Sequence, residues 1–368
     1  MSYKIFTSES VCSGHPDKIC DQISDAILDE CLKEDSGSRV AVETLVSTNT
    51  IVMAGEVTSK VKVNYEQIAR GIVKKLGYDK KIFKFDYESA KVYLFIHSQS
   101  PDIATGVLHG GAGDQGMMFG YACAETKELM PLTITIAHQI TKAIDKARET
   151  TLLYLRPDGK AEVTMEYSHG RPNRVLKVIT AVPHDPQIKQ KQLASDIYEV
   201  IIRPTLKTFG LSVEFSDTIC NGTGKWIIGG PSSDTGVTGR KIVVDSYGGM
   251  ARIGGGCFSG KDPTKVDRSG AYATRFIAKN IVARGYATRC EIQIAYVIGK
   301  PTPISKSIET FGTEKVSLEK IEKLAWSLLD LSVGGIIKGL DLQRPIYQDT
   351  AVYGHFGDPQ YNWEKIVV

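Results

Sequence analysis

The amino-acid sequence predicts an α+β protein built from three similar units, with mixed sheets packed against helices. Three observations support this prediction. A helix, two strands and a second helix are expected three times along the 368 residues, and a further strand follows in the first two rounds. A glycine-flanked loop carrying an aspartate precedes each round. No proline- or serine-rich linker separates the rounds, so we expect connections that cross between the units.

The first round is expected between residues 16 and 97. Its first helix is predicted because apolar residues recur every four positions and share one face: Ile19, Ile23, Ile27 and Cys31. Alternating apolar and polar residues then predict a hairpin, and a glycine ends the second helix. The expected ranges are 16–33 for the first helix, 39–47 and 50–59 for the hairpin, 65–76 for the second helix, and 91–97 for the last strand.

The second and third rounds are predicted from the same patterns. The second helix of the second round is expected to be bent or broken at Pro204, because proline lacks the backbone N–H of a helix interior. The expected ranges of the second round are 132–149 (helix), 161–167 and 174–182 (hairpin), 188–209 (helix) and 212–219 (strand). Those of the third round are 263–284 (helix), 290–298 and 305–311 (hairpin) and 317–331 (helix).

The composition argues against several classes of protein. Lys and Arg total 45 against 42 for Asp and Glu, an excess too small for a nucleic-acid arm or a membrane-surface protein. No apolar run approaches the length of a transmembrane helix, and the first residues lack a signal-peptide pattern. Seven cysteines without a CxxC pair are typical of reduced thiols. We therefore expect a cytoplasmic protein that binds neither nucleic acid nor membranes.

The three glycine-flanked loops are the candidate sites. Any one of them alone is typical of a turn in which glycine supplies positive φ and aspartate caps a helix. Together they carry more polar groups than capping requires. The loops are 14–18 (Gly-His-Pro-Asp-Lys), 111–116 (Gly-Ala-Gly-Asp-Gln-Gly) and 254–262 (Gly-Gly-Gly-Cys-Phe-Ser-Gly-Lys-Asp).

The third loop begins like a phosphate-binding P-loop, with Gly255 and Gly260 followed by Lys261. Asp262 stands where Ser or Thr would ligate magnesium, and no apolar strand runs directly into the loop, which argues against a P-loop nucleotidase or kinase. Asp262 and Pro263 are expected to be the N-cap and the first residue of a helix. Lys261 and Lys265 would then flank a helix N-terminus, a site for an anion such as a polyphosphate.

Aspartates recur every four residues after the first loop. Asp25 and Asp29 are expected to lie on a solvated acidic face. Asp17 is different, because it lies in the first helical turn beside His15, where a carboxylate is placed to hold a hard cation that bridges to phosphate. Asp267 is the candidate for a second acidic ligand.

Five cations lie near the glycine-rich segments: Lys160, Arg240, Lys241, Lys261 and Lys265. Together with an acidic metal site, they are the arrangement needed to neutralise a triphosphate. Trp226 is typical either of a core residue or of an aromatic that stacks on a base, and the sequence leaves both open.

Several further motifs follow the loops in a fixed order. They are Ser8-Glu-Ser-Val, Thr238-Gly-Arg-Lys-Ile, Tyr247-Gly-Gly-Met-Ala-Arg, Lys265-Val-Asp-Arg-Ser, Glu309-Thr-Phe-Gly-Thr and Tyr353-Gly-His-Phe-Gly. With the three loops, they make the chain resemble the methionine adenosyltransferase (S-adenosylmethionine synthase) family from Phe6 to about Lys365. The resemblance implies three similar α+β domains related by a pseudo-threefold axis. It also implies an N-terminal domain over 1–100, an active-site loop over 101–113, a central domain over 114–226 and a C-terminal domain over 227–368.

The resemblance implies that L-methionine and ATP give S-adenosylmethionine. The methionine sulfur would attack the 5′ carbon of ATP, and the released triphosphate would be hydrolysed to pyrophosphate and phosphate. Because a thioether is a weak nucleophile, the rate must come from alignment and from stabilising charge on the leaving triphosphate. The resemblance also implies Mg²⁺ and K⁺ as cofactors. It implies a homodimer with shared active sites, or a homotetramer of two such dimers.

The resemblance also implies a role for each matching residue. The catalytic residues would be His15, Lys160, Arg240, Lys261 and Lys265. ATP would be bound by His15, Asp158, Gly159, Lys160, Lys225, Trp226, Asp234, Arg240, Lys241, Cys257 and Lys261. Methionine would be bound by Glu56, Gln99, Asp234 and Lys265. Magnesium would be held by Asp17 and Asp267, and potassium by Glu43.

Some positions depart from the pattern expected of the family. Lys225-Trp226 stands where Arg-Phe is expected, Cys257 and Gly159 stand where alanine is expected, and the segment between Pro101 and Gly111 is shorter. The alternative function is a non-catalytic nucleotide-binding regulator of the same fold. Such a protein would be expected to have lost His15, Asp17, Lys261 or Asp267, and the sequence retains them all.

Overall fold

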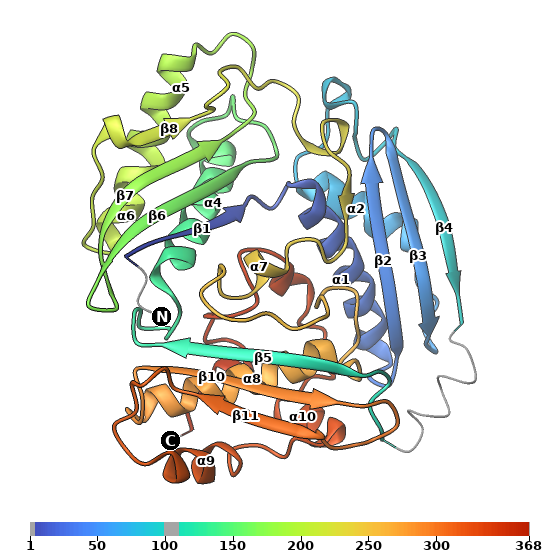
Figure 1. Cartoon of the computed structure of the whole chain (residues 1–368). Coiled ribbons are helices and arrows are strands. Elements are labelled where there is room, and N and C mark those ends of the chain that lie inside the picture. The colour runs from blue at the N-terminus through green and yellow to red at the C-terminus, as the bar shows by residue number, and fades with distance from the viewer. Residues whose placement is uncertain (1–3, 99–109, 368) are drawn as a thin grey trace.

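The fold consists of three sheets arranged around long helices (Figure 1). The computed structural model describes residues 4–98 and 110–367. Each sheet packs against one of three long helices: α1 (Pro16–Glu34), α4 (Leu132–Thr150) or α8 (Val266–Ala283). The predicted α+β class is therefore confirmed.

The three sheets repeat one plan. The first has the order β4-β3-β2-β9, and in it β2 (Arg39–Ser47) and β3 (Thr50–Thr58) form the hairpin. The second has the order β1-β6-β7-β8, with its hairpin made by β6 (Lys160–Ser168) and β7 (Arg171–Ala181). In both sheets the second hairpin strand pairs in parallel with a later strand, β4 (Lys91–His97) or β8 (Thr218–Cys220). The third sheet, β11-β10-β5, has its hairpin in β10 (Arg289–Tyr296) and β11 (Ser305–Glu309).

Each sheet is completed by a strand from another part of the chain. The first strand of each hairpin pairs antiparallel with a distant strand: β2 with β9 (Gly236–Val237), β6 with β1 (Ile5–Val11), and β10 with β5 (Gly116–Cys123). The connections therefore cross between the units, as expected from the missing linkers.

The remaining helices cover or connect the sheets. They are α2 (Tyr65–Lys75), α5 (Gln190–Asp196), α6 (Arg203–Thr208), α7 (Ile242–Asp245), α9 (Leu318–Ala325) and α10 (Val333–Gly339). Short 3-10 helices lie at Lys81–Phe83, Phe215–Asp217, Gly230–Ser232, Gln348–Ala351 and Asn362–Glu364. A π-helical stretch, Ile197–Ile202, joins α5 to α6, in which Pro204 is the second residue. The expected irregularity is therefore a widened turn before Pro204 and not a break in the helix. None of the described helices combines the length and apolar character that a bilayer crossing requires.

Several sequence expectations need correction. The strand expected over 212–219 is limited to β8, because a 3-10 helix occupies Phe215–Asp217. The helix expected from residue 263 begins at Val266, and its N-cap is Lys265 rather than Asp262, whose carboxylate instead accepts the Val40 N–H at 2.8 Å. The helix expected over 317–331 ends at Ala325. The strands β1, β5 and β9 and the helix α10 were not predicted.

The strand β5 lies directly against α8 at Gly120. A Cβ atom at Gly120 would come within 2.1 Å of the carbonyl carbon of Thr274, a backbone atom of the helix. Because neither backbone can yield cheaply, the close contact of strand and helix requires glycine here.

The variant Gly120→Ala is therefore expected to lower the free energy of unfolding by about 1–3 kcal/mol through overpacking. Gly71→Ala is the matched control, since Gly71 lies in α2 with nothing within 4 Å of its added methyl. Replacing this helical glycine should raise stability by about 0.5–1 kcal/mol. Urea denaturation of the two variants measures both effects, and equal stability of the two would contradict the close-contact argument.

The buried His138 connects the helix α4 to the strand β1. His138 of α4 is 6% exposed, and its Nδ1 lies 2.8 Å from the Ser10 hydroxyl of β1. Burial, and secondarily the charge of Lys18, lower the pKa of His138 to about 3. Between pH 6.5 and 3 the unfolded chain therefore binds a proton at this residue that the folded chain does not bind.

His138 should therefore contribute to acid sensitivity, with stability falling as the pH drops below about 6.5. One such histidine contributes a slope of about 1.4 kcal/mol per pH unit. His138→Gln should reduce the slope of unfolding free energy against pH between pH 6 and 4 by about this amount. His169→Gln, at an exposed position, is the control and should leave the slope unchanged. An unaltered slope in His138→Gln would show that this histidine is protonated in the folded state.

Candidate functional site

The N-terminus of α1 carries the first candidate residues. His15 is the N-cap of the helix, and its Nδ1 accepts the Asp17 N–H at 3.2 Å. The side chain is 1% exposed. Burial, followed by the positive charges of Lys241 and Lys160, lowers the pKa of His15 to about 3. The imidazole is therefore neutral at neutral pH, and Lys160 and Lys241 both lie near enough to affect it.

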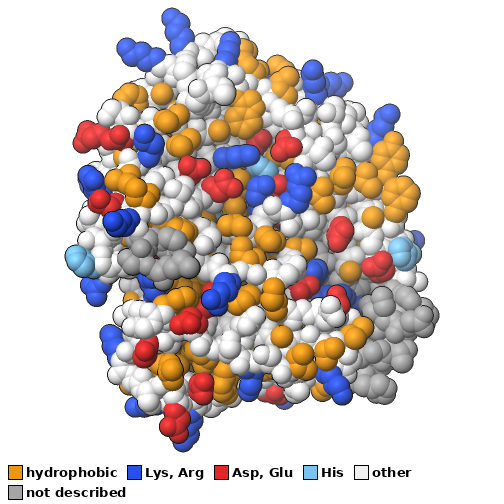
Figure 2. Space-filling view, in the orientation of Figure 1, with side chains coloured by type: hydrophobic (Ala, Val, Ile, Leu, Met, Phe, Trp, Pro, Cys, Tyr) orange, Lys and Arg blue, Asp and Glu red, His pale blue; other side chains and the backbone are white. Residues whose placement is uncertain are grey.

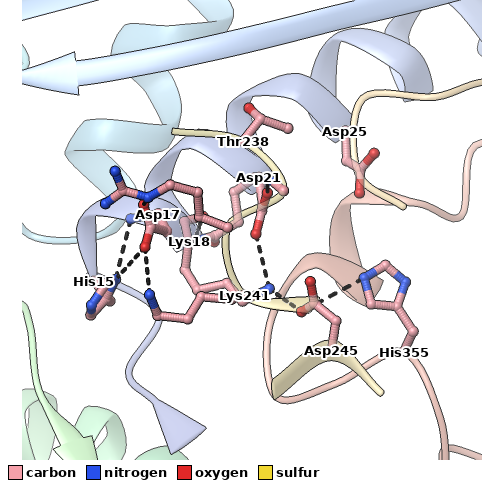
Figure 3. A network of polar contacts seen from close by, with 12 residues as sticks. His15, Asp17, Lys18, Asp21, Asp25, Thr238, Lys241, Asp245 and His355 are labelled. Carbon is pink, nitrogen blue, oxygen red and sulfur yellow. Dashed lines mark hydrogen bonds and ion pairs between the residues drawn. The ribbon is translucent and has the colours of Figure 1, made fainter. Parts of the chain in front are cut away.

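The Asp17 carboxylate forms ion pairs with two of the predicted cations, Arg240 and Lys241. Its Oδ1 accepts the Val237 N–H at 2.9 Å and forms an ion pair with Arg240 Nε, also at 2.9 Å. Its Oδ2 accepts a hydrogen bond from Lys241 Nζ at 2.5 Å (Figure 3). Burial alone would raise the pKa of Asp17, but the hydrogen bonds from Lys241 and Val237 outweigh it and lower the pKa. An ionised Asp17 therefore holds Arg240 and Lys241 beside His15.

The segment around Asp158 lies next to the same loop. A Cβ at Gly14 would come within 3.3 Å of the Asp158 backbone nitrogen. The buried Asp158 carboxylate accepts the N–H groups of Gly159 at 2.7 Å and Gly230 at 2.8 Å, and burial raises its pKa to about 6. Asp158 thereby ties the start of β6 to the turn that leads to Asp234, whose N–H donates to the Gly230 carbonyl.

Trp226 and Lys225 lie just before this turn. The indole of Trp226 is half-buried, and its Nε1 donates to the Ile228 carbonyl at 2.9 Å. Lys225 is exposed. The Trp226 side chain is thus anchored at one edge, which is compatible with either of the roles left open by the sequence.

A second group of candidates surrounds the loop 254–262. Lys261 Nζ lies 2.7 Å from Asp267 Oδ2, and a Cβ at Gly256 would come within 2.2 Å of the Asp267 carboxyl carbon. Cys257 lies against Gly239: a Cβ atom added to Gly239 would fall 2.6 Å from the Sγ of Cys257. The two cation-bearing loops therefore touch at Cys257 and Gly239. Lys265 lies apart from the carboxylate of Asp267, paired with Asp262 at 2.5 Å.

Glu43 and Glu56 lie on the two strands of the first hairpin. They project from β2 and β3 on the outer side of the sheet, since the buried neighbours Val42 and Thr44 face α1. Glu43 is exposed, and Glu56 lies 3.2 Å from His97. The described part of one chain therefore does not bring these two carboxylates together with His15. The candidate Gln99 and most of the expected loop over 101–113 lie outside the described residues.

The expectation of a solvated acidic face at Asp25 and Asp29 is wrong. Asp25 is fully buried and pairs with Arg268, whose nitrogens lie 2.7 and 2.9 Å from its two oxygens. Asp29 is 8% exposed and accepts the N–H groups of Tyr347 and Gln348. A four-residue spacing identifies a helix face but not its partner, and these partners lie more than 200 residues away in the sequence.

Sequence reasoning also missed the buried partners of Lys18. This lysine is 1% exposed, with Asp21 on one side at 3.0 Å and Asp245 on the other (Figure 3). Burial disfavours its charge, but the two carboxylates outweigh burial and raise the pKa of Lys18. The sequence did contain a signal for this pairing. Lys18 directly follows the candidate metal ligand Asp17 in the loop motif and had been given no role of its own.

The charges at this site suit a phosphorylated ligand. On the surface, Lys and Arg side chains gather with acidic side chains and a histidine near the centre of the face shown in Figure 2. The fold and this site define a three-domain α+β protein that presents cations and ionised carboxylates at one helix N-terminus.

Comparisons with known proteins identify the family. Models of the N-terminal, central and C-terminal domains of S-adenosylmethionine synthetase match residues 3–101, 109–226 and 228–365, respectively. An S-adenosylmethionine synthase of Treponema denticola is 50% identical over 370 residues, which cover 98% of this chain and 95% of that protein. The chain belongs to the S-adenosylmethionine synthetase family. The resemblance inferred from the ordered motifs is confirmed.

Proposed function

We propose that this chain is a methionine adenosyltransferase that makes S-adenosylmethionine from L-methionine and ATP, releasing triphosphate and hydrolysing it to pyrophosphate and phosphate. The family supports this activity, and the observation that carries it is the cluster of His15, Asp17, Arg240 and Lys241. A non-catalytic regulator would not need these residues together.

The cluster accounts for the chemistry without a protein nucleophile. The methionine sulfur forms the new bond to the ATP 5′ carbon as the bond to the triphosphate oxygen breaks, and the leaving group gains negative charge. Arg240 and Lys241 stabilise that charge, and the neutral His15 is available to donate a hydrogen bond to a phosphate oxygen. Lys160, Lys261 and Lys265 supply further positive charge, while Asp158, Gly159, Lys225, Trp226, Asp234 and Cys257 complete the proposed ATP site.

The carboxylates fit magnesium and potassium as cofactors. Among the described residues, no three His, Cys, Asp or Glu side chains are grouped to hold a metal ion. Mg²⁺ commonly uses one or two carboxylates together with substrate phosphates, and Asp17 and Asp267 are its proposed ligands. When bound, the ion would add positive charge to the triphosphate. Glu43 is the proposed potassium ligand.

The position of Glu56 favours an active site shared by two chains. Glu56, with Gln99, Asp234 and Lys265, is proposed to bind methionine, yet it faces away from His15 on the outer side of the sheet. Exposed apolar side chains accompany it on that face: Leu45, Tyr93 and Phe95. They contribute to the hydrophobic surface beside β4 (Figures 1 and 2). Such a face suits a homodimer, alone or paired in a homotetramer, because a second copy would cover it. We place this assembly in the cytoplasm.

The proposed activity is tested by incubating the purified protein with ATP, methionine and Mg²⁺ and measuring the sulfonium product by mass spectrometry. Lys241→Met should lower kcat/KM for ATP by about 100-fold or more, because a cation aimed at the developing charge is lost. The control is Lys323→Met at an exposed position on α9. Absence of product from the wild-type chain would refute the proposed activity, and full activity of Lys241→Met would remove Lys241 from the site.

Asp17→Asn should sharply raise the Mg²⁺ concentration needed for half-maximal activity. The substitution keeps the size of the side chain but removes the charge that a magnesium ligand requires. Magnesium titration of the variant, with Asp79→Asn at an exposed loop position as the control, measures the change. An unchanged half-saturating concentration would mean that Asp17 acts only through its contacts with Arg240, Lys241 and Val237.

A further inference from the structure

The helix α1 carries a row of four aspartates that hold distant backbone segments. Asp17, Asp21, Asp25 and Asp29 recur every four residues, and all are buried. Each accepts a backbone N–H at 2.8–3.0 Å: that of Val237, Gly239, Gly260 and Tyr347, in the same order. We call these four residues the aspartate row. Its spacing corresponds to about 6 Å along the helix axis between neighbours.

Two members of the row hold the cation-bearing loops without belonging to the proposed substrate site. Asp21 accepts the Gly239 N–H at 2.8 Å, one residue before Arg240. Asp25 accepts the Gly260 N–H at 2.8 Å, one residue before Lys261. Gly239 and Gly260 both have positive φ, 79° and 82°, so the chain turns at the point where each is held. The backbone position of each loop is therefore fixed from α1.

Each carboxylate of these two is itself held in place. Asp21 lies 3.0 Å from the buried Lys18, whose other partner is Asp245, the last residue of α7 (Figure 3). Asp25 accepts hydrogen bonds from both terminal nitrogens of Arg268 in a bidentate ion pair. Ser24 adds a weaker contact, since its hydroxyl lies 2.9 Å from that of Thr238, in the loop that carries Arg240. Because these ion pairs are buried, the carboxylates have little freedom to follow a displaced loop.

We propose that Asp21, and with it Asp25, are positioning residues that fix Arg240, Lys241 and Lys261 for binding triphosphate. The inference rests on the proposed function, since the cations matter only if a polyphosphate is bound. Displacement of a binding group by about 1 Å can cost about 100-fold in rate, so removing an anchor next to Arg240 should be measurable.

Asp29 is a matched control within the same row. It has the same side chain, the same helix and the same kind of backbone contact, but it holds Tyr347 and Gln348, which carry no candidate role. Asp29→Ala should lower stability and leave ligand binding as in the wild type. Asp21→Ala should lower stability and also weaken binding. A general effect of losing a buried carboxylate would affect both variants alike.

The experiment measures calorimetric binding of inorganic tripolyphosphate, with Mg²⁺, to the full-length wild type and variants. Asp21→Ala should weaken binding by about 10-fold or more and lower kcat/KM for ATP in parallel. Asp21→Asn should recover most of the affinity, because its amide oxygen still accepts the Gly239 N–H. Ser24→Ala, a milder change at the same loop, should weaken binding by a smaller factor. Urea denaturation establishes that each variant is folded.

The outcomes separate this proposal from the proposed function. Wild-type affinity in Asp21→Ala, or an equal loss in Asp29→Ala, would overturn the positioning role. If Asp21→Ala does not fold, unchanged affinity in Ser24→Ala would overturn it instead. A wild-type chain that binds no tripolyphosphate and makes no sulfonium product would refute the proposed function itself.

Discussion

Burial of charge along α1 is the constraint on which the rest of the molecule depends. A carboxylate inside a protein must be paired or fully hydrogen-bonded, because its desolvation is otherwise too costly. Apart from Lys18, which pairs with Asp21 within α1, the partners of the aspartate row come from the C-terminal part of the chain and include Arg268, Lys241 and the backbone of Tyr347. The first helix can therefore be stable in its buried position only when the last domain is in place around it.

The same requirement explains how glycine-rich segments become ordered. Loops such as 236–241 and 254–262 have few apolar side chains to anchor them and a high conformational entropy when free. Charged acceptors on a rigid helix replace hydrophobic contacts as the source of order, since hydrogen bonds to ionised groups are stronger than neutral ones. Glycine can then remain where the backbone needs positive φ, as at Gly239 and Gly260.

Local patterns in the sequence were sufficient for the hairpins and the long helices, which agree with the structure to within a few residues. They failed where stability comes from distant contacts. The strand β5 is buried on both sides and shows no alternation, and β9 is only two residues long, so neither has a local signal. For the site, composition of the loops indicated His15, Asp17 and Lys241, while the burial of Asp25 and Lys18 depended on partners that periodicity cannot reveal.

The exchange of strands between sheets has a consequence for how the chain acquires its structure. Ile5 pairs with Glu166, Val46 pairs with Gly236 and Cys123 pairs with Arg289, so none of the three sheets can close until much of the chain is available. During synthesis the first sheet would remain with an open edge until residue 236 emerges, and an open edge is a template for association. Contacts of such long sequence separation make folding slow relative to proteins with local contacts. The three domains are thus one cooperative unit in folding, and a fragment that ends at a domain boundary would lack a strand of its own sheet.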